Sequence, residues 1–178
     1  QTALRIVPQT QHFAGETAEL IDAYAVKIEG IDAAFRQSPV FTGVSLDHEE
    51  AVQQLGNFEK NFTDEMQVLE QNAHLCNVFE FPDKITPARD QLVEMQNMVD
   101  RMRNVWDVSE DIRCFVTDAK ALLWRELDIE SLEDGSKSRT KKLGALHKSV
   151  KWCDAFKNTG KVLKDFINTI PLIAMLRS

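Results

Sequence analysis

The side chains that most often do chemistry in proteins are few in this sequence and do not combine into a site. An H-x-x-x-H or H-E-x-x-H pair would place two zinc ligands on one helix face. Neither pair is formed by the four histidines, which are His12, His48, His74 and His147. His74 and Cys76 offer only two ligands, whereas a structural zinc site takes four. We therefore expect no metal ligand in this chain.

Motifs for nucleotide binding and nucleophilic catalysis are missing as well. The sequence contains neither G-x-x-x-x-G-K-[ST] nor G-x-G-x-x-G, the loops whose backbone amides cradle phosphates, and no G-x-S-x-G elbow. Neighbouring carboxylates such as Glu49 and Glu50, or Glu133 and Asp134, lie where helices are expected to begin. There they are explained by favourable interaction with the helix dipole. We expect no catalytic residue and no cofactor-binding residue.

The cysteines and the chain ends bear on the cellular compartment. Cys76, Cys114 and Cys153 are odd in number and never form a C-x-x-C pair, which suits reduced, buried thiols better than a disulfide framework. No leader pattern stands at the start, and no apolar stretch approaches the roughly 20 residues of a membrane span. We expect a soluble, intracellular protein without a membrane partner. Because it begins with Gln1 and ends in an apolar run, we interpret it as a fragment of a larger chain.

Large apolar side chains are the expected structural anchors. A buried tryptophan removes some 200 Å² from water, which contributes several kcal/mol at about 25 cal/mol per Å². Methionines at helical spacing, namely Met95, Met98 and Met102, could form an adaptable partner surface, but we interpret them as core filling. The predicted anchors are Phe35, Phe58, Phe62, Phe79, Phe81, Trp106, Trp124, Trp152, Phe156 and Phe166.

Composition and charge favour a helical protein that binds proteins. With 43% hydrophobic and 28% charged residues, the 178-residue chain can bury a core. Residues 1–135 carry 26 acidic and 11 basic side chains, whereas residues 136–178 carry 2 acidic and 10 basic ones. The basic part has almost no interleaved aromatic residues, which argues against nucleic acid. Its expected partner is an acidic protein or the acidic part of the chain itself.

The first half of the sequence predicts two helices. Residues 1–15 contain Pro8 and Gly15 without a clear period and are expected to form a strand or loop. Residues 16–37 form a helix that ends before Ser38-Pro39, and a loop follows to Ser45, the expected N-cap of a second helix reaching about residue 72. Residues 75–82 are expected to form a packed turn. The apolar seams consist of Leu20, Tyr24, Ile28, Ile31 and Phe35, and then of Val52, Leu55, Phe58, Phe62, Met66 and Leu69.

The second half predicts one long helix and several shorter ones. Thr86 with Pro87 opens a helix that can run to residue 124, with its seam beginning Leu92, Met95, Val99, Met102 and Trp106. Asp128 caps the next helix, whose apolar side reaches residue 150, and residues 135–140 are expected to be frayed or mobile because glycine weakens helices. A short helix follows Gly160, and another is expected to start near Pro171.

These patterns predict an all-α fold, an elongated bundle of long amphipathic helices. We divide it into an opening segment (residues 1–15), a helical bundle (residues 16–127) and the start of a further region (residues 128–178). The runs that carry a family resemblance are FRQSPVFTG at 35–43, VFEFP at 78–82, LLWRELDIE at 122–130, KWCDAF at 151–156, and residues 166–176. In this order they resemble the dynein heavy chain, where its N-terminal tail continues into the linker.

The resemblance implies a microtubule motor whose ATP- and Mg²⁺-binding ring lies far downstream of this segment. It implies a tail helical bundle followed by the start of the linker, with no cofactor in the segment itself. Implied partners are dynein intermediate, light-intermediate or light chains, other heavy chains, and the microtubule indirectly. The amino-acid sequence of residues 123–129 favours an axonemal heavy chain in a cilium or flagellum. The alternatives are a stand-alone helical scaffold or tether of the spectrin-like kind, although we find no repeat of constant period, and nucleic-acid binding through residues 137–151.

Overall fold

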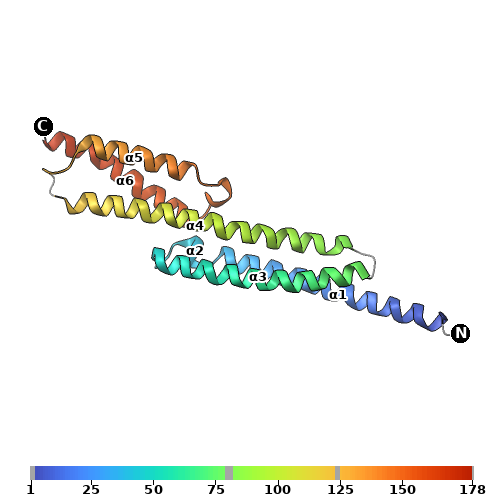
Figure 1. The fold of residues 1–178 in the computed structure, drawn as a ribbon. Helices are drawn as coiled ribbons and strands as arrows, with labels where there is room; N and C mark the ends of the chain where they lie inside the picture. The colour runs from blue at the N-terminus through green and yellow to red at the C-terminus, as the bar shows by residue number, and fades with distance from the viewer. Residues whose placement is uncertain (1–2, 79–81, 123–124, 178) are drawn as a thin grey trace. The chain divides into compact units, whose positions relative to one another are not determined.

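A computed structural model of the chain describes residues 3–78, 82–122 and 125–177, and the side chains of 15–78, 83–122 and 125–177. Throughout this part the regular structure is helical and no strand occurs, so the expected all-α fold is confirmed (Figure 1). The helices are α1 (Ala3–Arg36), α2 (Pro39–Thr42), α3 (His48–Val78), α4 (Thr86–Ala121), α5 (Ile129–Gly144) and α6 (Asp154–Arg177), with short 3₁₀ helices at Pro82–Ile85 and Lys148–Val150.

The chain divides into two units. Unit 1 comprises Gln1–Gln37 and Asn57–Asn97, and unit 2 comprises Ser38–Gly56 and Met98–Ser178. The divisions fall inside α3 and α4, so each of these helices contributes residues to both units. The segment boundaries expected from the sequence, after residues 15 and 127, stay a prediction. No helix among the described residues is long and apolar enough to cross a membrane.

Unit 1 is held together by aromatic rings between α1 and α3. The ring of Phe35 lies 4.8 Å from that of Phe58 and 5.0 Å, edge-on, from that of Phe62. Tyr24 donates a hydrogen bond to the backbone carbonyl of Glu65 at 2.7 Å, and its hydroxyl also lies 3.0 Å from the Glu65 carboxylate. Burial raises the pKa of Tyr24, and the Glu65 hydrogen bond and charge add to the shift. The hydroxyl therefore stays a neutral donor.

The C-terminal part of unit 2 is a bundle of the second half of α4 with α5 and α6. Figure 1 shows α5 and α6 running antiparallel beside that part of α4. The ring of Phe115 on α4 packs edge-on against that of Phe166 on α6 at 5.4 Å. The buried core consists of Ile112, Val116, Ala119, Leu127, Leu132, Leu163, Phe166 and Ile170.

The N-caps of α3 and α5 follow the capping rules, although the N-cap of α3 is not the residue that the sequence predicts. Asp128 accepts hydrogen bonds from the amides of Glu130 and Ser131, as expected. The cap of α3 is Asp47, because its carboxylate accepts from the Glu50 amide at 2.8 Å and the Glu50 carboxylate accepts from the Asp47 amide at 3.3 Å. The prediction of Ser45 was wrong. Ser45 has φ 55° and lies in the turn before this capping box.

The N-terminal boundaries also differ from the prediction. Residues 3–14 are part of α1 rather than a strand or loop, because Pro8 near a helix start removes one hydrogen bond without ending the helix. One turn of the expected loop over 38–45 is helical, as α2. Helix α3 continues to Val78 instead of ending near residue 72, so residues 75–78 do not form the expected turn.

The C-terminal corrections involve glycine and proline. Helix α5 is continuous through residues 135–140 and ends at Gly144, before residue 150. Helix α6 begins at Asp154, before Gly160, and continues through Pro171 without a new start. At Gly135 and at Pro171, tertiary packing outweighs the unfavourable helix propensity of the residue. Gly135 lies against the Phe115 ring, and the buried face of α6 continues beyond the turn that contains Phe166 to Ile170.

Substitution of two glycines should change stability in opposite directions. A Cβ on Gly135 would lie 2.7 and 2.9 Å from the Phe115 ring, which Phe166 and Arg139 hold in place, so Gly135→Ala should destabilise unit 2 by about 1–3 kcal/mol. The matched control, Gly56→Ala, meets no atom within 4 Å and should stabilise it by about 0.5–1 kcal/mol. Urea denaturation followed by circular dichroism measures both, and equal effects would contradict the packing argument.

The cap of α5 should make stability depend on pH. Hydrogen bonds from Ser131 hold the pKa of Asp128 below its ordinary value, so the ionised carboxylate stabilises the folded chain at neutral pH. This contribution is lost as the pH falls below about 4 and the carboxylate becomes protonated. Asp128→Ala should therefore be less stable than the unsubstituted chain at pH 7, and the difference should shrink in acid. A difference that grows on acidification would exclude this cap.

Candidate functional site

In unit 2, α2, α4 and the start of α6 meet at a junction that combines a buried hydrogen bond with close packing. Helix α2 (Pro39–Thr42) is a single turn, and its C-cap is Gly43, where φ is 71°. A helix this short leaves its carbonyls without helical partners. Trp106 of α4 fills that need, because its indole N–H donates to the carbonyl of Val40 at 2.8 Å in a buried position.

Helix α6 completes this junction from the other side. The ring of Trp152 stacks on Phe41 with centroids 5.5 Å apart and an interplanar angle of 13°. Gly43 comes so close to α6 that an added Cβ would lie 3.3 Å from the Cα of Ala155. Three segments far apart in the sequence therefore meet at one place. We call the set Val40, Phe41, Gly43, Trp106, Trp152 and Ala155 the tryptophan clasp.

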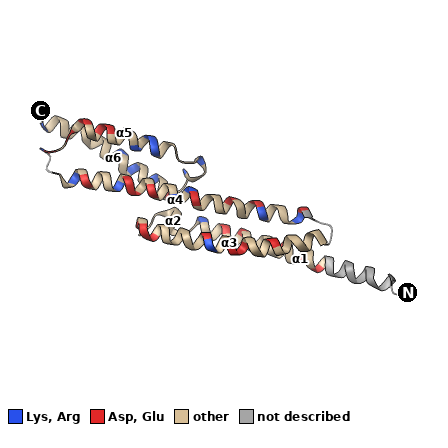
Figure 2. Ribbon diagram, in the orientation of Figure 1, with Lys and Arg blue, Asp and Glu red and all other residues tan. Residues whose placement is uncertain are grey.

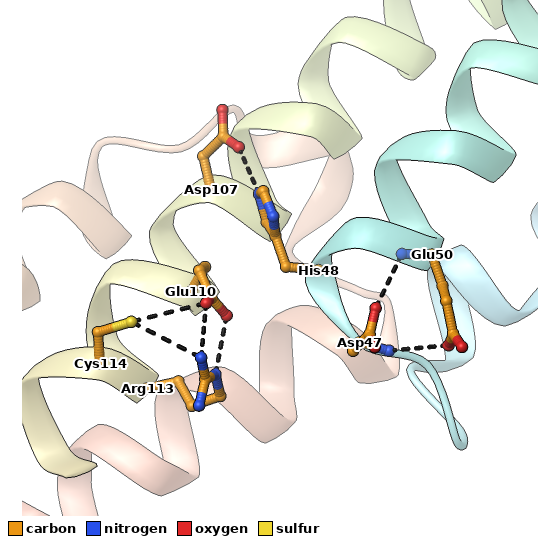
Figure 3. Close-up of polar contacts among 7 residues, drawn as sticks. All are labelled: Asp47, His48, Glu50, Asp107, Glu110, Arg113 and Cys114. Carbon is orange, nitrogen blue, oxygen red and sulfur yellow. Dashed lines mark hydrogen bonds and ion pairs between the residues drawn. The ribbon is translucent and has the colours of Figure 1, made fainter.

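Polar pairs along α4 and the start of α3 belong to the same unit (Figure 3). His48 Nε2 lies 2.9 Å from a carboxylate oxygen of Asp107. One turn further, the guanidinium of Arg113 donates to both carboxylate oxygens of Glu110, at 2.8 and 2.6 Å. These hydrogen bonds lower the pKa of Glu110. Both pairs are solvent-exposed, so they orient side chains on the helix surface and leave no carboxyl group primed for acid catalysis.

Cys114 beside this pair is not an activated thiol. Its Sγ lies 3.6 Å from the Glu110 carboxylate, and desolvation first, then this hydrogen bond, raises its pKa. A reactive cysteine needs the opposite shift. Cys76 and Cys153 are buried free thiols as expected, whereas Cys114 is exposed, so the prediction of burial was wrong for Cys114. Among the described residues, no group of three His, Cys, Asp or Glu side chains could hold a metal ion.

The predicted anchors fall into several environments. Phe35, Phe62, Trp106 and Phe166 are buried, Phe58 and Phe156 are half-buried, and Trp152 is 47% exposed although it stacks on Phe41. Phe79, Phe81 and Trp124 lie outside the described residues. The sequence reasoning missed Val40 and Phe41 as anchors, both of which are buried. The sequence does contain a signal for this turn, because Pro39 followed four residues later by Gly43 is typical of the start and end of one helical turn.

Part of the basic C-terminal segment pairs with the acidic part of the chain. Asp111 on α4 lies 3.2 Å from the guanidinium of Arg139 and 3.4 Å from the ammonium of Lys142 on α5. Arg139 also stacks over the Phe115 ring at 4.0 Å. Of the two partners expected for the basic segment, these contacts show the internal one.

Comparison with known proteins shows a similarity to one family. Residues 92–178 match a family model described as dynein heavy chain, N-terminal region 2. The match covers just under half of the chain, and over these residues the chain is similar to the dynein heavy chain family. The chain is also 28% identical, over 164 residues, to the dynein alpha chain of the flagellar outer arm of Chlamydomonas reinhardtii. That similarity covers 89% of this chain and 4% of the relative, so the chain spans only a small part of the relative's length.

The dynein resemblance inferred from sequence is confirmed, and the structure shows what its runs do. LLWRELDIE leads into the Asp128 cap of α5. KWCDAF supplies Trp152 and Ala155 of the tryptophan clasp at the start of α6. The second half of FRQSPVFTG forms α2, the third side of that clasp. VFEFP lies largely outside the described residues.

The hydrogen bond inside the clasp can be tested with two tryptophans. Trp106→Phe leaves the Val40 carbonyl buried without its donor and should destabilise unit 2 by roughly 1–3 kcal/mol. Trp152→Phe keeps a ring for Phe41 to stack on at a half-exposed position and should cost about 0.5 kcal/mol or less. Denaturation midpoints in urea compare the two, and a loss at Trp106 no larger than that at Trp152 would contradict a stabilising hydrogen bond to Val40.

Proposed function

We propose that this chain is the part of an axonemal dynein heavy chain that joins the tail to the linker, where it carries load and supports assembly with other dynein chains. The observation that carries the proposal is the match of residues 92–178 to the dynein heavy chain N-terminal region. The relative's flagellar outer-arm origin supports an axonemal, cytoskeletal location. This match favours a motor segment over a stand-alone spectrin-like scaffold.

The packing in unit 2 is suited to transmitting force between helices. Load entering α6 would reach α4 through the Phe115–Phe166 ring pair and, near the start of α6, through the tryptophan clasp. At the other end of α6, Arg177 donates to the carbonyl of Leu127, which lies just before α5. Helix α6 is thus tied to its neighbours near both ends. Closely packed interiors have low compressibility and pass strain on rather than absorb it.

The partners in this proposal are dynein intermediate, light-intermediate or light chains and other heavy chains, with the microtubule reached indirectly. ATP and Mg²⁺ act in the parent motor and not in this segment. The pure chain should therefore release no phosphate from MgATP, because its role is mechanical. A phosphate-release assay measures this. ATP turnover that co-purifies with the chain through successive columns would refute the proposal that this segment has no ATPase activity.

Location and assembly can be tested in ciliated cells of the source organism. An antibody raised against this chain should detect a heavy-chain-sized polypeptide in the high-salt extract of isolated axonemes, sedimenting with other dynein chains. Extracts of deciliated cell bodies and of axonemes stripped of dynein arms are the controls. An antigen that is absent from axonemes, or that sediments as a small free protein, would overturn the proposal.

A further inference from the structure

A groove between α5 and α6 lies on unit 2, away from the tryptophan clasp. Its floor is formed by Ile167, Ile170 and Pro171 of α6, with Ser136 and Thr140 of α5 opposite. Glu133 and Lys137 line its rim, and its volume is about 410 Å³. The described chain places nothing in this groove, although the lining is mostly apolar. We call it the α5–α6 groove.

Two polar groups at this groove lack partners that a helix normally provides. Ser136 is 3% exposed, and its hydroxyl has no hydrogen-bond partner among the described residues. Pro171 has no N–H to donate to the carbonyl of Ile167. Buried polar groups in native proteins are nearly always paired. The Ser136 hydroxyl is closed off from solvent, so it lies beneath the lining of the groove, and it is the charges along the groove that indicate an occupant.

Charge along the groove changes sign from one end to the other. The first turns of α5 carry Glu130, Glu133 and Asp134, and its later turns carry Lys137 and Lys141, as Figure 2 shows for this helix. All five side chains are exposed and none forms an ion pair within the described residues. Because α6 runs antiparallel to α5, the exposed Lys164, one turn before Ile167, adds to the basic end of the groove.

We propose that the α5–α6 groove binds an amphipathic helix of a partner chain, oriented antiparallel to α5. Helices favour acidic residues in their first turns and basic residues in their last turns. Antiparallel to α5, such a helix places its acidic start beside Lys137, Lys141 and Lys164. Its basic end then lies beside the acidic first turns of α5. Parallel to α5, like charges would meet at both ends.

The apolar side of this partner helix would cover Ile167, Ile170 and Pro171, as a further helix added to the bundle. The exposed Leu172, just beyond the groove floor, extends the apolar surface toward the acidic end. This inference rests on the proposed assembly role and specifies the chemistry of one partner.

Two designed peptides of identical composition test the orientation. Both are helical and carry one leucine stripe. The first has glutamates in its N-terminal half and lysines in its C-terminal half, and the second has the halves exchanged. Fluorescence anisotropy with the 178-residue chain should show the first binding at least tenfold more tightly. A nitroxide at its N-terminus should broaden amide signals near Lys141, not those near Glu130.

Charge reversal in the groove provides the matched comparison. Lys137→Glu with Lys141→Glu should weaken binding of the first peptide tenfold or more. Lys120→Glu with Lys148→Glu changes the charge equally at exposed positions that do not line the groove and should change the affinity less than twofold. Thr140→Trp, which fills the groove without changing charge, should also abolish binding, and circular dichroism establishes that each variant is folded.

Several results would overturn this inference. Equal binding of the two peptides, or equal losses in the groove and control variants, would show attraction to net charge only. Dimerisation of the chain that Thr140→Trp abolishes would make the occupant a second copy. A chain that is found in axonemal dynein but ignores both peptides refutes the groove and leaves the proposed function standing. Absence from axonemes refutes the proposed function whatever the peptides do.

Discussion

An amphipathic helix in water is stabilised mainly by covering its apolar face, and the described helices of this chain do so by packing on segments distant in sequence. In unit 1 the Phe35 ring meets Phe58 and Phe62, and in unit 2 Phe115 meets Phe166. Without these contacts the stripes would face solvent. The other features, including the caps, the glycine contact with Phe115 and the ion pairs on Asp111, refine an arrangement that apolar burial establishes.

The tryptophan clasp shows how a backbone requirement becomes a tertiary connection. Because α2 has a single turn, the carbonyl of Val40 has no helical partner, and burying it unpaired would be costly. The indole of Trp106 satisfies it, while Phe41 stacks on Trp152, which lies just before α6. One short turn thus fixes α4 and α6 in unit 2. In a segment proposed to belong to a dynein heavy chain and to carry load, such a connection would resist separation of the helices by both packing and a directional hydrogen bond.

Among the residues that the structure describes, some charged side chains on unit 2 form ion pairs within the unit, and others do not. Arg139, Lys142, Glu110 and Arg113 have partners within the unit, whereas the exposed charges of α5 that flank the α5–α6 groove have none among the described residues. Ser136, whose buried hydroxyl has no hydrogen-bond partner among them, is one of the residues that line that groove. The ion pairs of Asp111 hold α4 against α5. The remaining charges of α5 are acidic near its start and basic near its end, as the helix dipole favours. They therefore predict the orientation of a docked helix as well as the charges that it carries.

Residue patterns alone predict the helical class, the long α4 with its buried seam from Leu92 to Trp106, the Asp128 cap and the dynein resemblance. These features follow from local spacing and cap chemistry, which act within a few residues. Which stripe of α1 is covered became clear only from the packing of the helices: Ile21 is 1% exposed, whereas the predicted Leu20 is 64% exposed, although both lie near Tyr24 on the helix. Packing likewise explains why Gly135 and Pro171 lie inside continuous helices, and it brings Val40 and Phe41 against Trp106 and Trp152. The physical reason is that each outcome depends on contacts between residues far apart in the sequence, which no local pattern specifies.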